Sequence, residues 1–371
     1  MSGAAAPGGL TAHRLYPWAV ALVAMLTIVA SNGIINSGLT VFDESLLSEF
    51  GWSVGGLKLR DSIHFIGAAA LVVLSGWLLD RAGFKPLLLT GMALLTAVLL
   101  SYPSITSLGN VYTLHAVLAV VLACSGNMVA LLTAAAWMPE RRGLAVGIAI
   151  AGTSVGGMLI PPLAALLNET IGWRDAMTWL ALLPATVFVL ILLIVRNRRA
   201  DPGGQAASDA DGLTFLEALA TPQFWLIGLA GVCTFYAILS LYSHLFLYLR
   251  GLSFEPATAA LGLTLLSAVG FAGKLGAGWL ADHVNPYWLI RACMLTMLAG
   301  LALIVWLPGG VWLGLAVTGL GWGSLHTLYN YLLLALFGMR AAGRINGSTS
   351  AAEAAGGAAV MTPSITAKAA E

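Results

Sequence analysis

The chain has 371 residues, of which 59% are hydrophobic and only 9% are charged, whereas soluble domains carry roughly 25% charged residues. With a mean hydropathy of +0.90, polar groups are too few to cover a folded chain of this length in water, so the surrounding solvent is lipid. The formal net charge of +1 excludes nucleic acid as a partner, because binding phosphates needs clustered Lys and Arg.

Long, continuous apolar runs predict an all-α integral membrane protein, since each spanning helix needs about 20 apolar residues. The first run follows a single basic residue, Arg14, and is too long for a signal-peptide core, so we expect it to remain as an uncleaved span. We predict about eleven spans, at residues 17–42, 60–80, 86–102, 110–137, 143–167, 174–195, 223–249, 257–281, 287–307, 311–338 and 344–366.

Basic residues gather in alternate loops, and short cytoplasmic loops are the ones enriched in Lys and Arg. The loops near Arg81, Arg142, Arg198 and Arg340 are basic, whereas the loop near Asp43 is acidic. We therefore expect a multi-pass protein with a cytoplasmic N-terminus, in a bacterial inner (cell) membrane.

Residues 197–221 contain "RRADPGGQAASDADG", whose Pro, Gly, Ser and Asp content cannot form a packed core. We interpret this stretch as a flexible cytoplasmic linker between an N-terminal half of six helices, residues 1–196, and a C-terminal half of five helices, residues 222–371.

The two halves resemble each other in sequence. "GWLLD" at 76–80 recurs as "GWLAD" at 278–282, an offset of 278 minus 76, or 202. Parallel six-helix repeats are a transporter architecture. The offset places the counterpart of span 174–195 at about 376 to 397, so we expect a second half that lacks its last helix and exposes an apolar groove.

The stretch "GWLLDRAGFK" at 76–85 combines glycines, which let backbones approach closely, with a charge cluster at two helix ends. It resembles the signature loop of the major facilitator superfamily, G-x-L-x-D-R-x-G-R-K, although Phe84 replaces a basic residue. The resemblance implies alternating access and a gating role for this loop, while a purely topological role with Asp80 capping a helix is the simpler alternative. The gating residues it implies are Gly76, Asp80, Arg81, Gly83 and Lys85, with Gly278 and Asp282 in the second half.

The fifth span, "GLAVGIAIAGTSVGGMLIPP", is rich in small residues. Gly147, Gly152 and Gly156 fall close to a four-residue period, which lets a neighbouring helix pack closely and slide. Tight static packing explains the same pattern equally well.

Ionisable residues inside spans are costly unless they are paired or face water, so they are the best pointers to function. Lys274 lies eight residues before Asp282, or about 12 Å along a helix, which is too deep for easy access to the interface. We take Lys274 as the leading substrate-binding residue. Glu353 is a deep acid of the second half and a candidate counter-ion or proton carrier.

A second polar group surrounds the outer end of span 60–80. Arg60 and His64 share a helix face at i, i+4 and are candidate substrate-binding residues, and Asp61 is a candidate proton or counter-ion residue. The alternative is a solvated outer helix end that binds nothing.

Uncharged polar residues complete the predicted site. An uncharged polar residue in a span more often contacts another helix than binds a ligand. Four asparagines together nevertheless predict a modestly polar central cavity. They are Asn32, Asn36, Asn127 and Asn330.

The segments "GLTVFDESLLSEFGWS" and "KLGAGWLAD" resemble the monocarboxylate and oxalate/formate transporter branch. In that branch an arginine of the eighth span binds the substrate carboxylate, and Lys274 replaces it at the matching place. Lysine lacks the bidentate fork with which arginine holds a carboxylate.

No phosphate-binding GxxxxGK[ST] loop, HExxH pattern or Ser/His/Asp arrangement occurs in the sequence, so we expect neither ATP hydrolysis, nor an enzyme, nor a cofactor. The prediction is a monomeric secondary active transporter of a small organic anion, a monocarboxylate, coupled to protons or working by exchange. The alternatives are a transporter of a neutral or cationic solute, as in efflux, and a membrane sensor that transports nothing.

Overall fold

The structure, a computed structural model, describes residues 8–196 and 212–361, and these residues are almost entirely helical. In this part of the chain the β-type pairing is one isolated bridge between Gly212 and Gly338. The prediction of an all-α membrane protein is confirmed.

The first half contains helices from α1 to α8. Their bounds are α1 Gly8–Ile28, η1 Val29–Gly38 (π), η2 Leu39–Phe42, α2 Asp43–Phe50, α3 Val54–Ala82, α4 Phe84–Ser101, η3 Tyr102–Ser104, α5 Leu108–Ser125, α6 Asn127–Trp137, η4 Pro139–Arg141, α7 Arg142–Leu180 and α8 Leu182–Ile194. The second half contains α10 Phe215–Leu219, α11 Pro222–Gly251, α12 Pro256–Ala281, α13 Pro286–Trp306, η5 Pro308–Gly310, α14 Val311–Phe337 and α15 Ala342–Met361.

Local sequence signals explain where these helices begin and end. Ser53 caps the start of α3 by accepting a hydrogen bond from the Gly56 amide, and Ser107 forms a capping box with Asn110 at the start of α5. Gly172 has φ of +80°, which a residue with a side chain rarely adopts, and it kinks α7 between the predicted spans 143–167 and 174–195.

Seven helical stretches in the described ranges are long and apolar enough to cross a membrane. One of them, Pro139–Ile194, contains two predicted spans. The backbone leaves the helical conformation at Gly172, between these two spans. The number of about eleven crossings stays a prediction.

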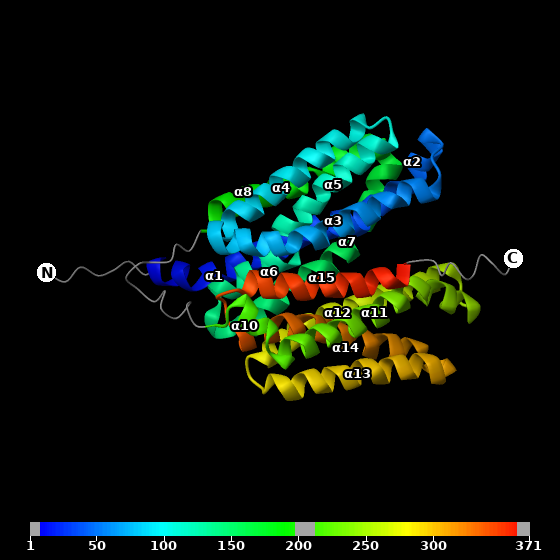
Figure 1. The fold of residues 1–371 in the computed structure, drawn as a ribbon. Coiled ribbons are helices and arrows are strands. Elements are labelled where there is room, and N and C mark those ends of the chain that lie inside the picture. Colours follow the sequence, from blue (N-terminus) through cyan, green and yellow to red (C-terminus); the bar gives the residue numbers. More distant parts are fainter. Residues whose placement is uncertain (1–7, 197–211, 362–371) are drawn as a thin grey trace.

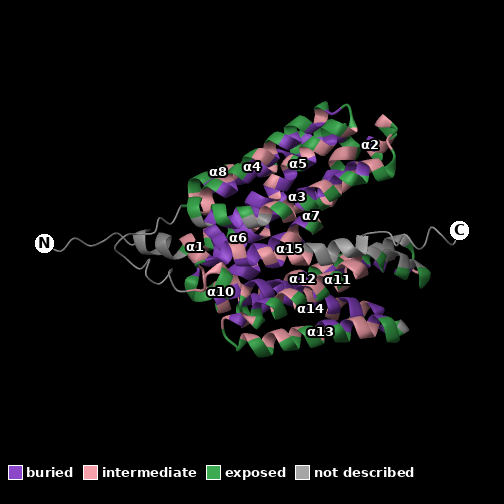
Figure 2. Cartoon of the chain, viewed as in Figure 1, coloured by how far each residue is buried: buried purple, intermediate pink, exposed green. Residues whose placement is uncertain are grey.

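Figure 2 shows exposed residues along the peripheral helices, and many of these residues are large and hydrophobic. Trp306 at the end of α13 is 80% exposed and Leu193 of α8 is 73% exposed. A soluble protein would leave few such side chains in water, so these side chains fit a lipid environment.

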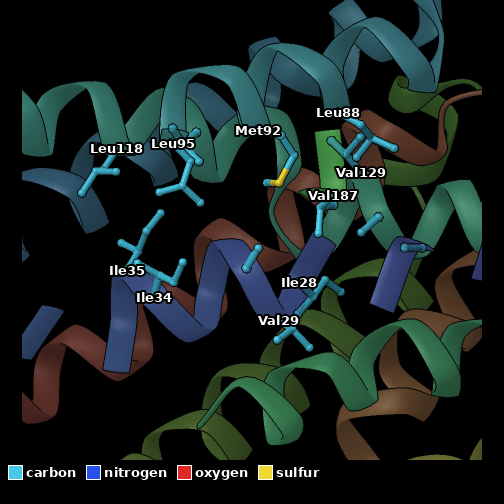
Figure 3. Packing of buried hydrophobic residues seen from close by; sticks show 14 of the residues in the cluster. Ile28, Val29, Ile34, Ile35, Leu88, Met92, Leu95, Leu118, Val129 and Val187 are labelled. Atoms are coloured by element: carbon cyan, nitrogen blue, oxygen red, sulfur yellow. The ribbon is translucent and has the colours of Figure 1, made fainter. Parts of the chain in front are cut away.

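The first half packs around α1 and η1 (Figure 3). Ile28 and Ile34 from this continuous helix meet Met92 of α4, Val129 of α6 and Val187 of α8 in one buried apolar cluster. A smaller cluster in the second half joins α11, α12 and α14 through Leu245, Leu266 and Leu315.

The two halves meet chiefly where α7 packs on α12 and α3 on α15, with smaller contacts of α7 with α14 and of α6 with α15. In Figure 1, α7 and α15 lie between a group formed by α3, α4 and α5 and a group formed by α11 to α14. Side chains and backbone groups on α3, α7, α12 and α15 therefore lie at the interface between the halves.

The predicted linker 197–221 is partly structured. Residues 197–211 lie outside the described residues, but Leu213 donates a backbone hydrogen bond to the Phe337 carbonyl, and α10 follows with a Thr214–Glu217 capping box. Ala218 of α10 is buried against Phe337 and Ile345. The expectation of a flexible segment is therefore wrong for residues 212–221, because these apolar side chains dock on the ends of α14 and α15.

Candidate substrate site and gate

Lys274 lies on α12 at the interface between the halves and is only 4% exposed. Its Nζ donates to Thr153 Oγ1 at 2.6 Å and to Ser154 Oγ at 2.7 Å, both on α7. Two hydroxyl groups supply dipoles but no negative charge. Among the described residues Lys274 forms no ion pair, so its ammonium group is held in a buried place without a counter-ion.

Glu353 is not that counter-ion in this structure. Its carboxylate lies against α11, where a side chain added at Gly231 would come within 2.8 Å of Glu353 Oε1. The structure therefore does not bring Lys274 and Glu353 together.

Helix α14 supplies the rest of the surroundings of Lys274. Thr327 Oγ1 donates to the Lys274 carbonyl at 3.3 Å, and the Lys274 charge acts electrostatically on His326. His326 is buried, and its Nδ1 has no hydrogen-bond partner. This unpartnered nitrogen near an ammonium group is a second polar feature of the site.

An aromatic cluster adjoins His326. The centroid of the His326 ring lies 5.2 Å from that of Trp322. The Phe235 ring of α11 meets both edge-on, with its centroid 4.9 Å from Trp322 and 5.4 Å from His326. Sequence reasoning missed Phe235 and Trp322, as well as Thr153 and Ser154. The four-residue spacing of Trp322 and His326 on one helix was the available signal.

The four predicted asparagines lie in different parts of the structure. Asn36 is exposed and donates to Asn32 Oδ1 at 3.2 Å, within the π-helical segment η1. Asn127 begins α6, and its Oδ1 is buried without a partner. Asn330 Nδ2 donates to the His326 carbonyl at 2.8 Å. Asn330 therefore lies beside the Lys274 region, whereas Asn32 and Asn36 belong to the first half.

Arg60 is not at a solvated helix end, because it is fully buried. Its guanidinium donates to Asp43, to the Leu39 carbonyl at 3.2 Å and to Asp61 Oδ1 at 3.4 Å. The segment from η2 to α2 folds over the N-terminal part of α3 and brings Asp43 and the Leu39 carbonyl, which no local pattern around Arg60 indicates. The alternative of a solvated helix end is therefore wrong for Arg60.

The neighbouring candidate residues, Asp61 and His64, also make contacts within this region of the first half. Lys58 pairs with Asp43 at 2.5 Å and with Asp61 at 3.5 Å. His64 is buried and its Nδ1 lies 3.0 Å from that of His115 on α5. Arg60, Asp61 and His64 thus form an outer network inside the first half, apart from Lys274.

Glycines bring the halves into close contact at one end of the molecule. A Cβ at Gly278 of α12 would lie 2.6 Å from the Gly143 carbonyl of α7, and one at Gly76 of α3 would lie 2.5 Å from the Gly343 carbonyl carbon of α15. These distances allow only glycine without a shift of the helices. Two of the glycines predicted for the gate, Gly76 and Gly278, are therefore contact points between the halves.

Asp282 adds a polar contact beside Gly278. Its two carboxylate oxygens accept hydrogen bonds from the Gly143 and Leu144 amides, at 2.8 and 2.9 Å. A carboxylate at the N-terminus of α7 satisfies amides that the helix leaves free and interacts well with the helix dipole. The second-half motif thus fastens α12 to the first half.

The first-half motif behaves differently in the part that the structure describes. Arg81 stacks on the Trp77 ring at 4.2 Å, Gly83 ends α3 with φ of +81°, and Lys85 Nζ donates to the Leu192 carbonyl at 2.7 Å. These contacts stay within the first half. The Asp80 side chain lies outside what the structure describes.

Two helical halves in contact at one end, with a buried lysine between them, define the fold of a membrane transporter. The chain belongs to the Major Facilitator Superfamily, whose family model matches residues 5–361. The predicted family is confirmed, and its members are transporters, not enzymes.

Relatives of this chain include transporters with different described cargoes. An oxalate:formate antiporter of Oxalobacter formigenes is 24% identical over 75% of this chain and 66% of its own length. A fujikurins efflux protein of Gibberella fujikuroi is 29% identical over 78% of this chain and 62% of its own length. The chain thus spans less than two thirds of the length of these relatives.

A crystal structure of the Major Facilitator Superfamily transporter FucP in the outward conformation matches the fold with a TM-score of 0.71. It is 16% identical and covers 96% of this chain and 92% of its own. At this identity the likeness establishes the fold alone.

Proposed function

We propose that this chain is a secondary active transporter that carries a small organic anion, a monocarboxylate, across a cell membrane by alternating access, coupled to protons or by exchange. The observation that carries the proposal is the buried ammonium group of Lys274, which has two hydroxyl partners and no acid. A charge in a low-dielectric place is costly without a counter-charge, and a substrate carboxylate would supply it.

The location of Lys274 supports a role in transport as well as in binding. Lys274 is on α12, its hydroxyl partners are on α7, and these helices belong to opposite halves. A carboxylate that replaced the hydroxyl groups would change the contact between the halves. Binding would then favour one arrangement of the halves over another, as a transported substrate must.

The glycine contacts and the Asp282 bonds form the proposed cytoplasmic gate. All lie at helix ends that the basic-loop pattern assigns to the cytoplasm, and they hold the two halves together there. We infer that the arrangement described is closed toward the cytoplasm, with the N-terminus also on that side. The relatives include fungal and bacterial proteins, so a bacterial inner membrane is not supported over other cell membranes.

An efflux role for a larger, neutral or cationic solute is the second candidate. The rings of Phe235, Trp322 and His326 form an apolar surface beside Lys274, and one relative is described as an efflux protein. Such a solute would rely on stacking rather than on the Lys274 charge.

Uptake into proteoliposomes, screened across organic acids with and without a pH gradient, tests the proposal. We expect saturable uptake of a monocarboxylate, its loss in Lys274→Ala and its retention in Lys274→Arg, because arginine preserves the charge. Arg291→Ala is the matched control, since Arg291 is an exposed basic residue on α13. Undiminished anion uptake by Lys274→Ala would remove Lys274 from the site, whereas no uptake of any organic acid by the wild type would favour the second candidate.

A further inference from the structure

The outer network contains a chain of hydrogen bonds that no part of the proposed substrate site uses. Arg60 Nη1 donates to Tyr102 Oη at 3.4 Å, Tyr102 Oη lies 3.2 Å from His115 Nε2, and the two Nδ1 atoms of His115 and His64 lie 3.0 Å apart. All four side chains are buried. The chain joins α3, η3 and α5.

The direction of each bond follows from the first donor. Arginine only donates, so Tyr102 accepts from Arg60 and has its own hydrogen available for His115 Nε2. A neutral His115 then carries its hydrogen on Nδ1 and donates to His64 Nδ1. His64 must carry its hydrogen on Nε2, and this nitrogen is buried without a partner among the described residues.

The reverse assignment is less favourable. If His64 donated to His115, His115 Nε2 would donate to Tyr102, and the Tyr102 hydrogen would face no acceptor given by its contacts. Both the Tyr102 hydroxyl and His64 Nε2 would then be unsatisfied. Each buried, unsatisfied polar group costs about 1–3 kcal/mol, so the structure fixes one tautomer for each ring.

We propose that the His64–His115 pair is a proton-binding site, and that its proton is the one coupled to transport; this second part rests on the proposed function. An added proton must go to His64 Nδ1 or to His115 Nε2, because the other two ring nitrogens already carry hydrogens. Both positions are acceptors in the chain. Proton uptake therefore replaces an acceptor by a donor. At His64 Nδ1 the added hydrogen removes the hydrogen bond between α3 and α5, and at His115 Nε2 it reverses the bond to Tyr102 and leaves the phenol hydrogen without an acceptor among the described residues.

The charged groups that face the pair set its electrostatics. Asp61 and Arg60 of α3 act on His64, and Arg60 acts on His115. Asp43 of α2 and Lys58 of α3 complete the network through Arg60 and Asp61. Two acids balance two bases, so one added proton leaves the network with a single positive charge, which a bound organic anion would offset.

A metal ion is the other cation to consider, because ligand atoms of Asp61, His64 and His115 lie within 4.8 Å of one another. However, Asp61 already forms ion pairs with Arg60 and Lys58. A dication would take Asp61 from both bases and add two positive charges beside them. The geometry therefore favours a proton.

Helix α3 connects this site to the gate. His64 and Gly76 lie on the same continuous helix, separated by about 18 Å at 1.5 Å per residue, and Gly76 packs against Gly343 of the second half. Release of the outer contact between α3 and α5 would let α3 tilt and would disturb the contact at Gly76. Proton binding outside is thereby linked to the cytoplasmic gate.

The first experiment measures the ring tautomers without any substrate. The six histidines are labelled with ¹⁵N in protein without a polyhistidine tag and assigned by single substitutions. We expect His115 to carry its hydrogen on Nδ1 and His64 on Nε2, and both rings to change in one step on acidification. His283 is an internal control, because its Nδ1 lies 2.7 Å from the Trp279 carbonyl and must donate.

Tyr102→Phe adds a conservative variant to this experiment. Without the phenol donor, His115 should populate both tautomers. A hydrogen on His115 Nε2 in the wild type, or two rings that titrate independently, would overturn the site. If one metal ion were bound per protein and both rings carried their hydrogens on Nε2, the pair would be a metal site and not a proton-binding site.

The second experiment tests coupling. In proteoliposomes we expect a pH gradient to stimulate substrate uptake by the wild type, and the ratio of uptake with and without the gradient to fall to about one in His64→Gln and His115→Gln. His244→Gln, at an exposed histidine on α11, should keep the wild-type ratio. A wild-type ratio in His64→Gln or His115→Gln would contradict coupling, whereas no uptake by the wild type would contradict the proposed function and leave the tautomer result standing.

Discussion

At the scale of single residues, the buried charges of this chain differ in how they are compensated. Arg60 contacts two acids, whereas the partners of the Lys274 ammonium group among the described residues are the hydroxyl groups of Thr153 and Ser154. A compensated charge contributes to folding, and an uncompensated one costs stability until a ligand arrives. This difference separates a structural role for Arg60 from a binding role for Lys274.

Lys274 and Glu353 should act independently on stability. Side chains with no shared contact give changes in free energy of unfolding that add within about 0.3–0.5 kcal/mol. We expect this additivity in thermal or denaturant unfolding of Lys274→Ala, Glu353→Ala and the double variant. A double variant that restores the stability lost by Lys274→Ala would instead indicate an ion pair.

Arg60 should be a strong determinant of stability. Arg60→Met leaves Asp43 and Asp61 with Lys58 as their remaining basic partner, and loss of one member of a buried ion pair costs about 3–5 kcal/mol. Arg174→Met is the matched control, because Arg174 pairs with Glu49 at an exposed position, where ion pairs contribute little. Equal melting temperatures for the two variants would contradict the buried network.

At the scale of helices, glycines decide how closely α7 and α12 approach. Gly278 contacts Gly143, but Gly276, two residues earlier on α12, has open space where a Cβ would lie. The same helix therefore offers a glycine that is required and one that is not.

Gly278→Ala should weaken the cytoplasmic gate, and Gly276→Ala should not. The new Cβ at 278 would lie 2.6 Å from the Gly143 carbonyl, so α7 and α12 must separate. Labelling of a cysteine placed on the cytoplasmic side of the interface should become faster in Gly278→Ala alone. Similar labelling of both variants would show that the close approach does not hold the gate.

Asp282 should affect turnover more than substrate affinity, because it stabilises one state without contacting the ligand. Its bonds to the Gly143 and Leu144 amides are charge-assisted and together contribute about 1.5–3 kcal/mol or more to the closed gate. We expect Asp282→Ala to reduce the maximum rate more than Asp282→Asn, which keeps one acceptor. Weakened binding with an unchanged rate would place Asp282 in the substrate site.

At the scale of the whole molecule, the proposed orientation in the membrane follows from the basic loops. Cysteines at Leu216 of α10 and at Thr106, both exposed, should label from opposite sides once Cys124, Cys233 and Cys293 have been replaced. An impermeant reagent added to sealed cells should reach position 106 and not position 216. Labelling at 216 from outside would reverse the proposed topology.

Much of the architecture is determined by the sequence alone, because lipid forces backbone groups to bond within helices and long apolar runs must then become helices. The repeated motif also drew attention to Gly76 and Gly278, which the structure places at contacts between the halves. Both features depend on local residue order, so they can be read along the chain.

The tertiary structure alone decided which polar groups meet. Thr153 and Ser154 are more than a hundred residues from Lys274, at sequence separations of 121 and 120, and Asp43 reaches Arg60 only because α2 folds over α3. A sequence shows that a buried charge needs a partner, but its partner depends on how helices pack. For this reason the fold and the depth of Lys274 were predictable, while the burial of Arg60 and the chain from Arg60 to His64 were not.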